Sequence, residues 1–184
     1  MSKALLKQLG DMTLPVEVSR KLHNAQLLVS ATDMALALDR LAVAVTAELQ
    51  DKNPVLLTIA PDGAYLLGVF LQRTVFPLQT LQGAFADEGF VCSGDEPSLS
   101  GRRVLIVDSG LTPLSAMQQV VTWLQTRGVS EILRSSVLVT PHPVQADGIA
   151  QTLSAVVCEA VAPFGCGIGL NGYCRNLPGL YAAG

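Results

Sequence analysis

Two hydrophobic patterns alternate along the chain. Four short segments rich in apolar residues predict strands, and the continuous apolar run at 55–60 is typical of a strand buried on both faces. The four segments occupy residues 55–60, 103–108, 132–139 and 154–158. Between them, apolar residues recur every three or four positions and predict amphipathic helices over 31–50 and 114–127. Strands that alternate with helices predict an α/β fold with a mainly parallel sheet flanked by helices.

Local signals set the limits of these elements. Ser30 followed by Asp33 resembles a capping box at the start of the first helix, and Pro54 ends it. A short helix is predicted over 64–71 and a further strand over 76–81. Residues 83–101 are rich in glycine, serine and acids, and we expect them to form a long surface loop.

Composition narrows the class of protein. The chain has 184 residues, of which 49% are hydrophobic and only 15% charged, which predicts one compact domain and excludes a disordered chain. The net charge of −3 argues against a basic surface that would bind nucleic acid. We expect no membrane span and no secretion signal, because apolar runs are short. Four cysteines without a CxxC pair do not make a disulfide scaffold, so a reduced, cytoplasmic protein is predicted.

Ligands of parallel sheets bind at the carboxyl ends of the strands, which makes the loops at 61–64, 108–115 and 140–147 candidates for a site. Asp108 is the sharpest feature, because it ends a strand and precedes a loop and a helix. It either belongs to a ribose- or phosphate-binding loop or simply caps a turn. His23 and His142 have no partner at zinc-ligand spacing, and residues 165–169 are interpreted as a glycine-rich turn.

Two segments carry a resemblance to a known family. Residues 101–128 resemble the central strand, loop and helix of the type I phosphoribosyltransferases. Residues 164–178 resemble the end of the hypoxanthine-guanine branch, with matches at Tyr173 and 175–178. The resemblance covers about residues 25–182. It implies a single domain over 1–184, with a core at about 25–160, a small hood from the N-terminal segment and about 160–184, and assembly as a homodimer.

This family transfers a phosphoribosyl group from phosphoribosyl pyrophosphate to a purine, with Mg²⁺ on the pyrophosphate. Its central loop has two acids, two apolar residues, a third acid and then Thr-Gly-x-Thr. The resemblance places that loop on Asp108, Ser109, Gly110, Leu111, Thr112, Pro113, Leu114 and Ser115. Asp108 keeps the first acid, and Thr112 stands at the third. Pro113 lacks a backbone donor, and Leu114 replaces a glycine that would allow close approach to a phosphate.

The family's other sites are also altered. The resemblance places the pyrophosphate loop on Pro61, Asp62 and Gly63, and the base pocket near Thr140, Pro141 and Phe164. Metal would be held at Asp108 and at Gly169, which has no ligating side chain. Two hypotheses follow. In the first, the protein is a divergent copy with lost or very weak transfer activity and acts as a ligand-binding or scaffold module. In the second, it is an active purine phosphoribosyltransferase in which Thr112 and Ser115 supply substitute contacts. In the first, purine nucleotide or phosphoribosyl pyrophosphate binds weakly and no cofactor is needed; in the second, Mg²⁺ is required.

Overall fold

The computed structural model describes residues 6, 7, 9, 11–141, 143 and 145–184. The chain divides into two compact units, Leu38–Cys158 and Met1–Ala37 with Glu159–Gly184, and each is described separately. Within the described residues, no helix combines the length and apolar character that a membrane span requires. The four cysteines are free, and only Cys166 among them is fully buried, whereas Cys92, Cys158 and Cys174 are partly buried.

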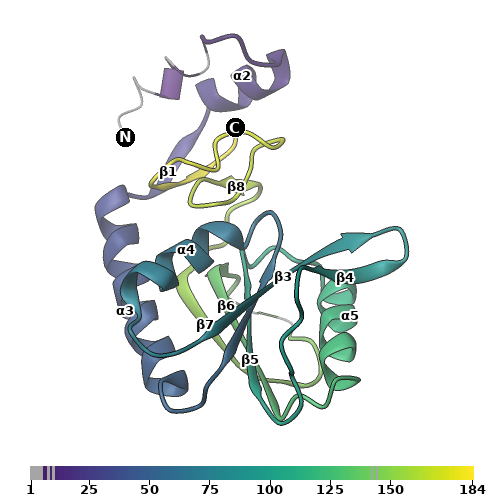
Figure 1. Cartoon of the computed structure of the whole chain (residues 1–184). Coiled ribbons are helices and arrows are strands. Elements are labelled where there is room, and N and C mark those ends of the chain that lie inside the picture. The colour runs from purple at the N-terminus through teal and green to yellow at the C-terminus, as the bar shows by residue number, and fades with distance from the viewer. Residues whose placement is uncertain (1–5, 8, 10, 142, 144) are drawn as a thin grey trace. The chain divides into compact units, whose positions relative to one another are not determined.

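The larger unit is built on a six-stranded sheet (Figure 1). Its strands are β2 (Val55–Ile59), β3 (Gln79–Ala86), β4 (Gly89–Ser93), β5 (Arg103–Asp108), β6 (Glu131–Val139) and β7 (Ile149–Val157). In space the order is β4-β3-β2-β5-β6-β7, and every neighbouring pair is parallel except β3–β4. The predicted α/β fold with a mainly parallel sheet is confirmed.

Helices cover both faces of this sheet, as Figure 1 shows. They are α3 (Ala31–Leu49), whose first turns belong to the smaller unit, α4 (Ala64–Arg73) and α5 (Leu114–Gln125). Ser30 caps α3 as predicted, because its Oγ accepts from the Asp33 N–H at 3.1 Å. The Asp33 carboxylate accepts from the Ser30 hydroxyl at 2.6 Å rather than from the Ser30 backbone N–H of a capping box. The apolar face of α5 packs on β2, β5 and β6 in one core cluster.

Two predicted strands have other limits than expected, and one predicted loop contains strands. The strand expected over 76–81 begins at Gln79 and continues to Ala86, and the strand expected from residue 154 begins at Ile149. The segment 83–101 is not one long loop. Its first half forms a β-hairpin with a two-residue turn, in which β3 and β4 pair antiparallel through Phe85 and Phe90. The alternation of buried and exposed residues there is interrupted by glycines and acids, which concealed it.

The smaller unit contains α2 (Val16–His23) and a three-stranded antiparallel sheet. Its strands are β1 (Gln26–Val29), β8 (Pro163–Phe164) and β9 (Leu180–Ala182), in the order β1-β9-β8. Residues 165–169 form the predicted turn, in which the Gly165 N–H donates to the Ile168 carbonyl at 2.9 Å. His23 bonds to the Ser19 carbonyl and to Asp11, and both contacts raise its pKa.

Candidate functional site

The carboxyl ends of β2 and β5 lie side by side in the sheet and bring two of the predicted loops together. A cavity of about 350 Å³ lies there. Its lining consists of Ile59, Ala60, Asp62, Phe85, Leu111, Thr112, Pro113 and Ala116. Six of these eight side chains are apolar, and the polar ones are a carboxylate and a hydroxyl. The structure therefore joins the predicted pyrophosphate and phosphoribosyl loops around one mainly apolar cavity.

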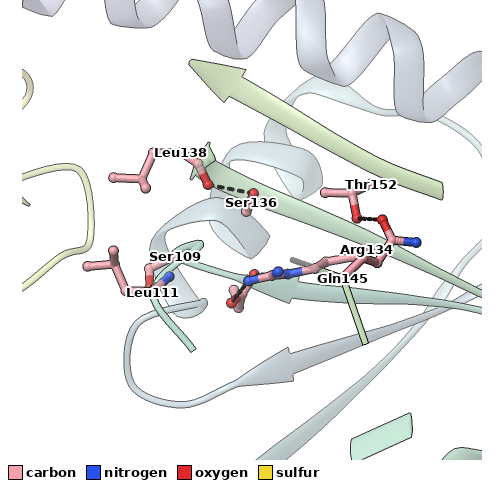
Figure 2. Close-up of polar contacts among 8 residues, drawn as sticks. Ser109, Leu111, Arg134, Ser136, Leu138, Gln145 and Thr152 are labelled. Carbon is pink, nitrogen blue, oxygen red and sulfur yellow. Dashed lines mark hydrogen bonds and ion pairs between the residues drawn. The ribbon is translucent and has the colours of Figure 1, made fainter. Parts of the chain in front are cut away.

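Asp108 is completely buried at the end of β5 and is held by an arginine of the next strand. Arg134 Nε donates to Asp108 Oδ1 at 3.1 Å, and Nη2 donates to Oδ2 at 2.7 Å. Figure 2 labels Arg134, whose guanidinium makes this two-pronged contact. Arg134 is only 8% exposed. Such bidentate pairs are strong and specific in geometry, so both carboxylate oxygens are engaged within the protein.

The register of the strands explains the pairing. Arg134 lies opposite Ile106, and Asp108 lies opposite Ser136. Arg134 and Asp108 therefore point to the same face of the sheet, two residues apart along it, and the long arginine side chain spans that distance. Beside them, Thr152 Oγ1 bonds Gln145 at 3.0 Å (Figure 2). Polar side chains thus take the place of apolar packing around Asp108 and Arg134.

Arg134 was not predicted as a site residue. It is the only charged residue among 132–138, and all of these residues are buried. A buried arginine needs an acidic partner, so its position in a buried strand could have indicated an ion pair. Phe85 was missed for another reason, since the hairpin that carries it was interpreted as a loop.

The loop that follows Asp108 is packed against β6. The Leu138 N–H donates to the Ser109 carbonyl at 3.2 Å, and the Leu111 N–H donates to Ser109 Oγ at 3.2 Å. Gly110 has a φ of +98°, and a Cβ added to it would lie 1.9 Å from the Leu138 carbonyl oxygen. Only glycine fits there. The serine that stands for the family's second acid is itself buried and bonded within the loop.

The start of α5 presents side chains where the family's loop presents backbone. Pro113 occupies the N-cap position without a side-chain cap, and Leu114 is exposed. Thr112 and Pro113 line the cavity, whereas Leu114 and Ser115 do not. Ser115 instead lines a separate groove together with Glu88, Gly89 and Phe90 of the hairpin. The two hydroxyls proposed as substitute contacts are therefore not brought to one cavity.

The turn after β2 keeps a tight glycine. A Cβ added to Gly63 would lie 2.2 Å from the Val107 carbonyl oxygen, and the Gly63 N–H donates to the Ile59 carbonyl at 2.8 Å. Pro61 follows a cis peptide bond. Asp62 lines the cavity and places a carboxylate in it. This turn therefore adds negative charge on the side where a pyrophosphate would need donors.

Two predicted base-pocket residues belong to the larger unit and one to the smaller unit. Thr140 and Pro141 are exposed after β6 and are not among the cavity's lining residues, and His142 lies outside the described residues. Phe164 is fully buried in the smaller unit, where its ring stacks on Tyr181 with centroids 5.5 Å apart. Within that unit it is a core residue.

The expected metal position is filled by an arginine. A Cβ on Gly169 would lie 2.8 Å from the Arg175 guanidinium carbon, and Arg175 Nη1 donates to the Gly167 carbonyl at 2.8 Å. Among the described residues, no group of three or more histidine, cysteine, aspartate or glutamate side chains is arranged to hold a metal. Proteins usually hold Mg²⁺ through one or two carboxylates together with substrate phosphates and waters, and Asp108 is already paired with Arg134. These residues do not fit a magnesium site.

Comparison with known proteins supports the fold. No family model matches the sequence, and no curated protein does. The solved structures similar to this chain include three phosphoribosyltransferases that each match 86% of it. A hypoxanthine phosphoribosyltransferase from Staphylococcus aureus has a TM-score of 0.70, with 18% identity over 92% of its length. A hypoxanthine-guanine phosphoribosyltransferase from Bacillus anthracis has a TM-score of 0.73, with 12% identity over 97%.

The third structure is a hypoxanthine-guanine-xanthine phosphoribosyltransferase, with a TM-score of 0.68 and 20% identity over 96% of its length. All three identities are too low to carry an activity over. The likeness extends along most of each chain, as the resemblance of residues 25–182 predicts. This chain therefore has the hypoxanthine-guanine type of type I phosphoribosyltransferase fold.

Proposed function

We propose that this protein is a non-catalytic ligand-binding or scaffold module, in which phosphoribosyl transfer to hypoxanthine or guanine is lost or very weak. One observation carries the proposal. Both oxygens of Asp108, the only acid retained in the central loop, bond to the buried Arg134 guanidinium. To reach a ribose, the carboxylate would have to break this pair and leave a buried charge unpaired, which is strongly unfavourable.

The cavity beside this pair supports the same conclusion. A phosphoribosyl pyrophosphate is highly anionic and needs converging donors. The cavity offers one hydroxyl, Thr112, together with apolar side chains and the carboxylate of Asp62. Removal of one such donor lowers a rate by about 10²–10³-fold. The competing enzyme hypothesis requires Thr112 and Ser115 to act together, and only Thr112 lines the cavity.

Calorimetric titration tests the proposal directly. We expect phosphoribosyl pyrophosphate, GMP and IMP to bind weakly at most, and Mg²⁺ to leave that binding unchanged. An assay with hypoxanthine or guanine, phosphoribosyl pyrophosphate and Mg²⁺ is expected to yield no nucleotide. Robust nucleotide formation by the unmodified protein would contradict the proposal.

A restored loop provides the matched comparison. The variant Ser109→Asp/Thr112→Asp/Pro113→Thr/Leu114→Gly restores the family's second and third acids and the Thr-Gly pair, and adding Arg134→Ser to it removes the partner of Asp108. We expect phosphoribosyl pyrophosphate to bind more tightly to the variant that also lacks Arg134 than to the loop variant alone. Equal affinity in the two would show that the Asp108–Arg134 pair does not control the site.

Further parts of the proposal concern assembly and setting. We propose one phosphoribosyltransferase-like domain that forms a homodimer in a reducing, cytoplasmic setting. Supporting a dimer, α3 and α4 border a surface groove of about 530 Å³ between Val43 and Arg73. Val43, which lines this groove, is 71% exposed, and unpartnered apolar surface marks interfaces. Light scattering should return twice the 19.4 kDa chain mass, and Val43→Arg should return the monomer. A monomer in both would contradict the dimer.

A further inference from the structure

The β3–β4 hairpin is held firmly against α5. The Phe90 ring covers Gly83, where an added Cβ would lie 2.1 Å from its tip. The same ring meets Trp123 of α5 edge to face, with centroids 5.5 Å apart. The Arg127 guanidinium lies 3.5 Å from the centre of the Trp123 ring and also pairs with Glu96 at 2.7 Å. These contacts fix the outer strand β4 in place.

β4 is the edge strand of the sheet (Figure 1). It pairs with β3 on one side only. Alternate residues of an antiparallel strand direct their N–H and C=O groups away from the partner. Within the described chain, no backbone hydrogen bond outside the regular elements involves residues 89–93. The free edge of β4 thus offers a preformed row of donors and acceptors.

A groove of about 460 Å³ lies between this hairpin and α5. It is lined by Glu88, Gly89, Phe90, Ser115, Gln118, Gln119, Thr122, Trp123 and Thr126. Trp123 provides partly exposed apolar surface and Phe90 is buried, and hydroxyl and carboxamide side chains also line the groove. A groove between an edge strand and a helix suits an extended peptide, whose backbone bonds to the strand while alternate side chains face the helix.

Charge indicates which peptide fits. Residues 79–101 contain four acids and no lysine or arginine. Two acids, Asp87 and Glu88, form the hairpin turn, and two others, Asp95 and Glu96, follow β4. α5 carries no charged residue over 114–125. The edge strand is therefore flanked at both ends by carboxylates, of which only Glu96 pairs with Arg127.

We propose that β4 and α5 bind an extended, basic segment of a partner protein, which adds to the sheet as a further strand. The cations of that segment would face the acids at the two ends of β4, and its apolar residues would face Phe90 and Trp123. A second copy of this chain fits poorly. Antiparallel pairing of two β4 strands would set Asp87 and Glu88 of one copy against Asp95 and Glu96 of the other, and like charges across strands are destabilising.

Rhodamine-labelled acetyl-Lys-Lys-Val-Thr-Val-Thr-Val-Lys-Lys-amide, followed by fluorescence polarisation, is a direct probe. Two matched peptides serve as controls, one with glutamate for every lysine and one with proline for both threonines. We expect the basic peptide to bind and both controls to fail, because the first is repelled and the second cannot form a strand ladder. Amide hydrogen exchange should slow at β4 when the basic peptide is present.

Two variants locate the site. Thr122→Arg places a cation in the groove and should abolish binding, whereas Gln72→Arg, on the exposed side of α4, should not change it. Glu88→Lys/Asp95→Lys should weaken binding about tenfold at low salt and less at high salt. Equal binding of the proline peptide, unchanged binding to Thr122→Arg, or no binding of the basic peptide would each overturn the proposal. Self-association through β4 in the absence of peptide would overturn it as well.

Discussion

The face of the central sheet that packs on α5 has two regions with different interactions. In the region of β5 and β6, a buried ion pair joins Asp108 and Arg134. In the region of β3 and β4, the rings of Phe85, Phe90 and Trp123 form an aromatic cluster. Apolar burial stabilises a fold by removing surface from water. A buried ion pair contributes little net stability, because desolvation offsets its attraction. The aromatic half therefore anchors the hairpin, whereas the polar half removes a carboxylate from the site.

The largest expected effect comes from breaking the ion pair on one side. Arg134→Met leaves the Asp108 carboxylate buried without a partner, and it should lower the free energy of unfolding by about 3–5 kcal/mol. The double variant Asp108→Leu/Arg134→Met removes both charges and should recover most of that loss. Urea denaturation of the wild type, both single variants and the double variant measures the coupling. Additive losses would show that the pair does not act as a unit.

The aromatic half should respond to truncation of its central ring. Phe90→Ala removes the contact with Trp123 and uncovers Gly83, and it should lower the free energy of unfolding by about 3 kcal/mol. Val91→Ala is the matched control, because Val91 is the next residue and is exposed, so we expect a loss of about 0.5 kcal/mol. Similar losses from both would mean that the hairpin is not anchored through Phe90.

The Arg127 contacts at the surface should matter less. Its guanidinium lies over Trp123 and pairs with Glu96, but both partners of the ion pair are about one-third exposed. Exposed cation–π contacts and surface ion pairs each contribute about 0.5–1 kcal/mol or less. Thermal unfolding of Arg127→Met should therefore show a loss near 1 kcal/mol, smaller than that of Phe90→Ala. A loss as large as that of Phe90→Ala would make Arg127 the anchor instead.

The smallest expected effect is the pH dependence of the Cys92 thiol, which lies in β4. Burial, and then the nearby Glu96 carboxylate, raise the pKa of Cys92 to about 11, although Arg127 lowers it in part. Iodoacetamide labelling of Cys92 in the folded protein should therefore be slow at pH 8 and rise toward pH 11, because only the thiolate reacts. Stability from the buried neutral thiol is complete below its usual pKa of 9.0 and is lost as the pH rises toward 11.

Mass spectrometry of the labelled peptide separates Cys92 from the other cysteines, and the urea-unfolded chain is the control. Arg127→Met should slow the labelling further, since it removes the one charge that favours the thiolate. Rapid labelling of the folded protein at pH 8 would show that β4 opens readily. That result would also remove the rigid edge strand that the peptide proposal requires.

Much of the larger unit follows from local pattern alone. Residues 55–60 and 103–108 were predictable as buried strands because a strand covered on both faces is mostly apolar, whereas the apolar ends of 132–139 enclose Arg134 and two serines. α3 begins directly after Ser30 because the serine hydroxyl caps the helix. The hairpin escaped prediction, because its turn, Asp87–Glu88, is not one of the glycine-containing pairs that mark tight hairpins.

The sequence by itself determined which residues occupy the loops at the carboxyl ends of β2 and β5, including the loss of acids and donors at 109, 113 and 114. Only the tertiary structure decided what became of Asp108. Arg134 lies 26 residues further along the chain, and no local pattern joins them. The parallel register of β5 and β6 sets both side chains on one face of the sheet, where water is excluded and the two charges must pair.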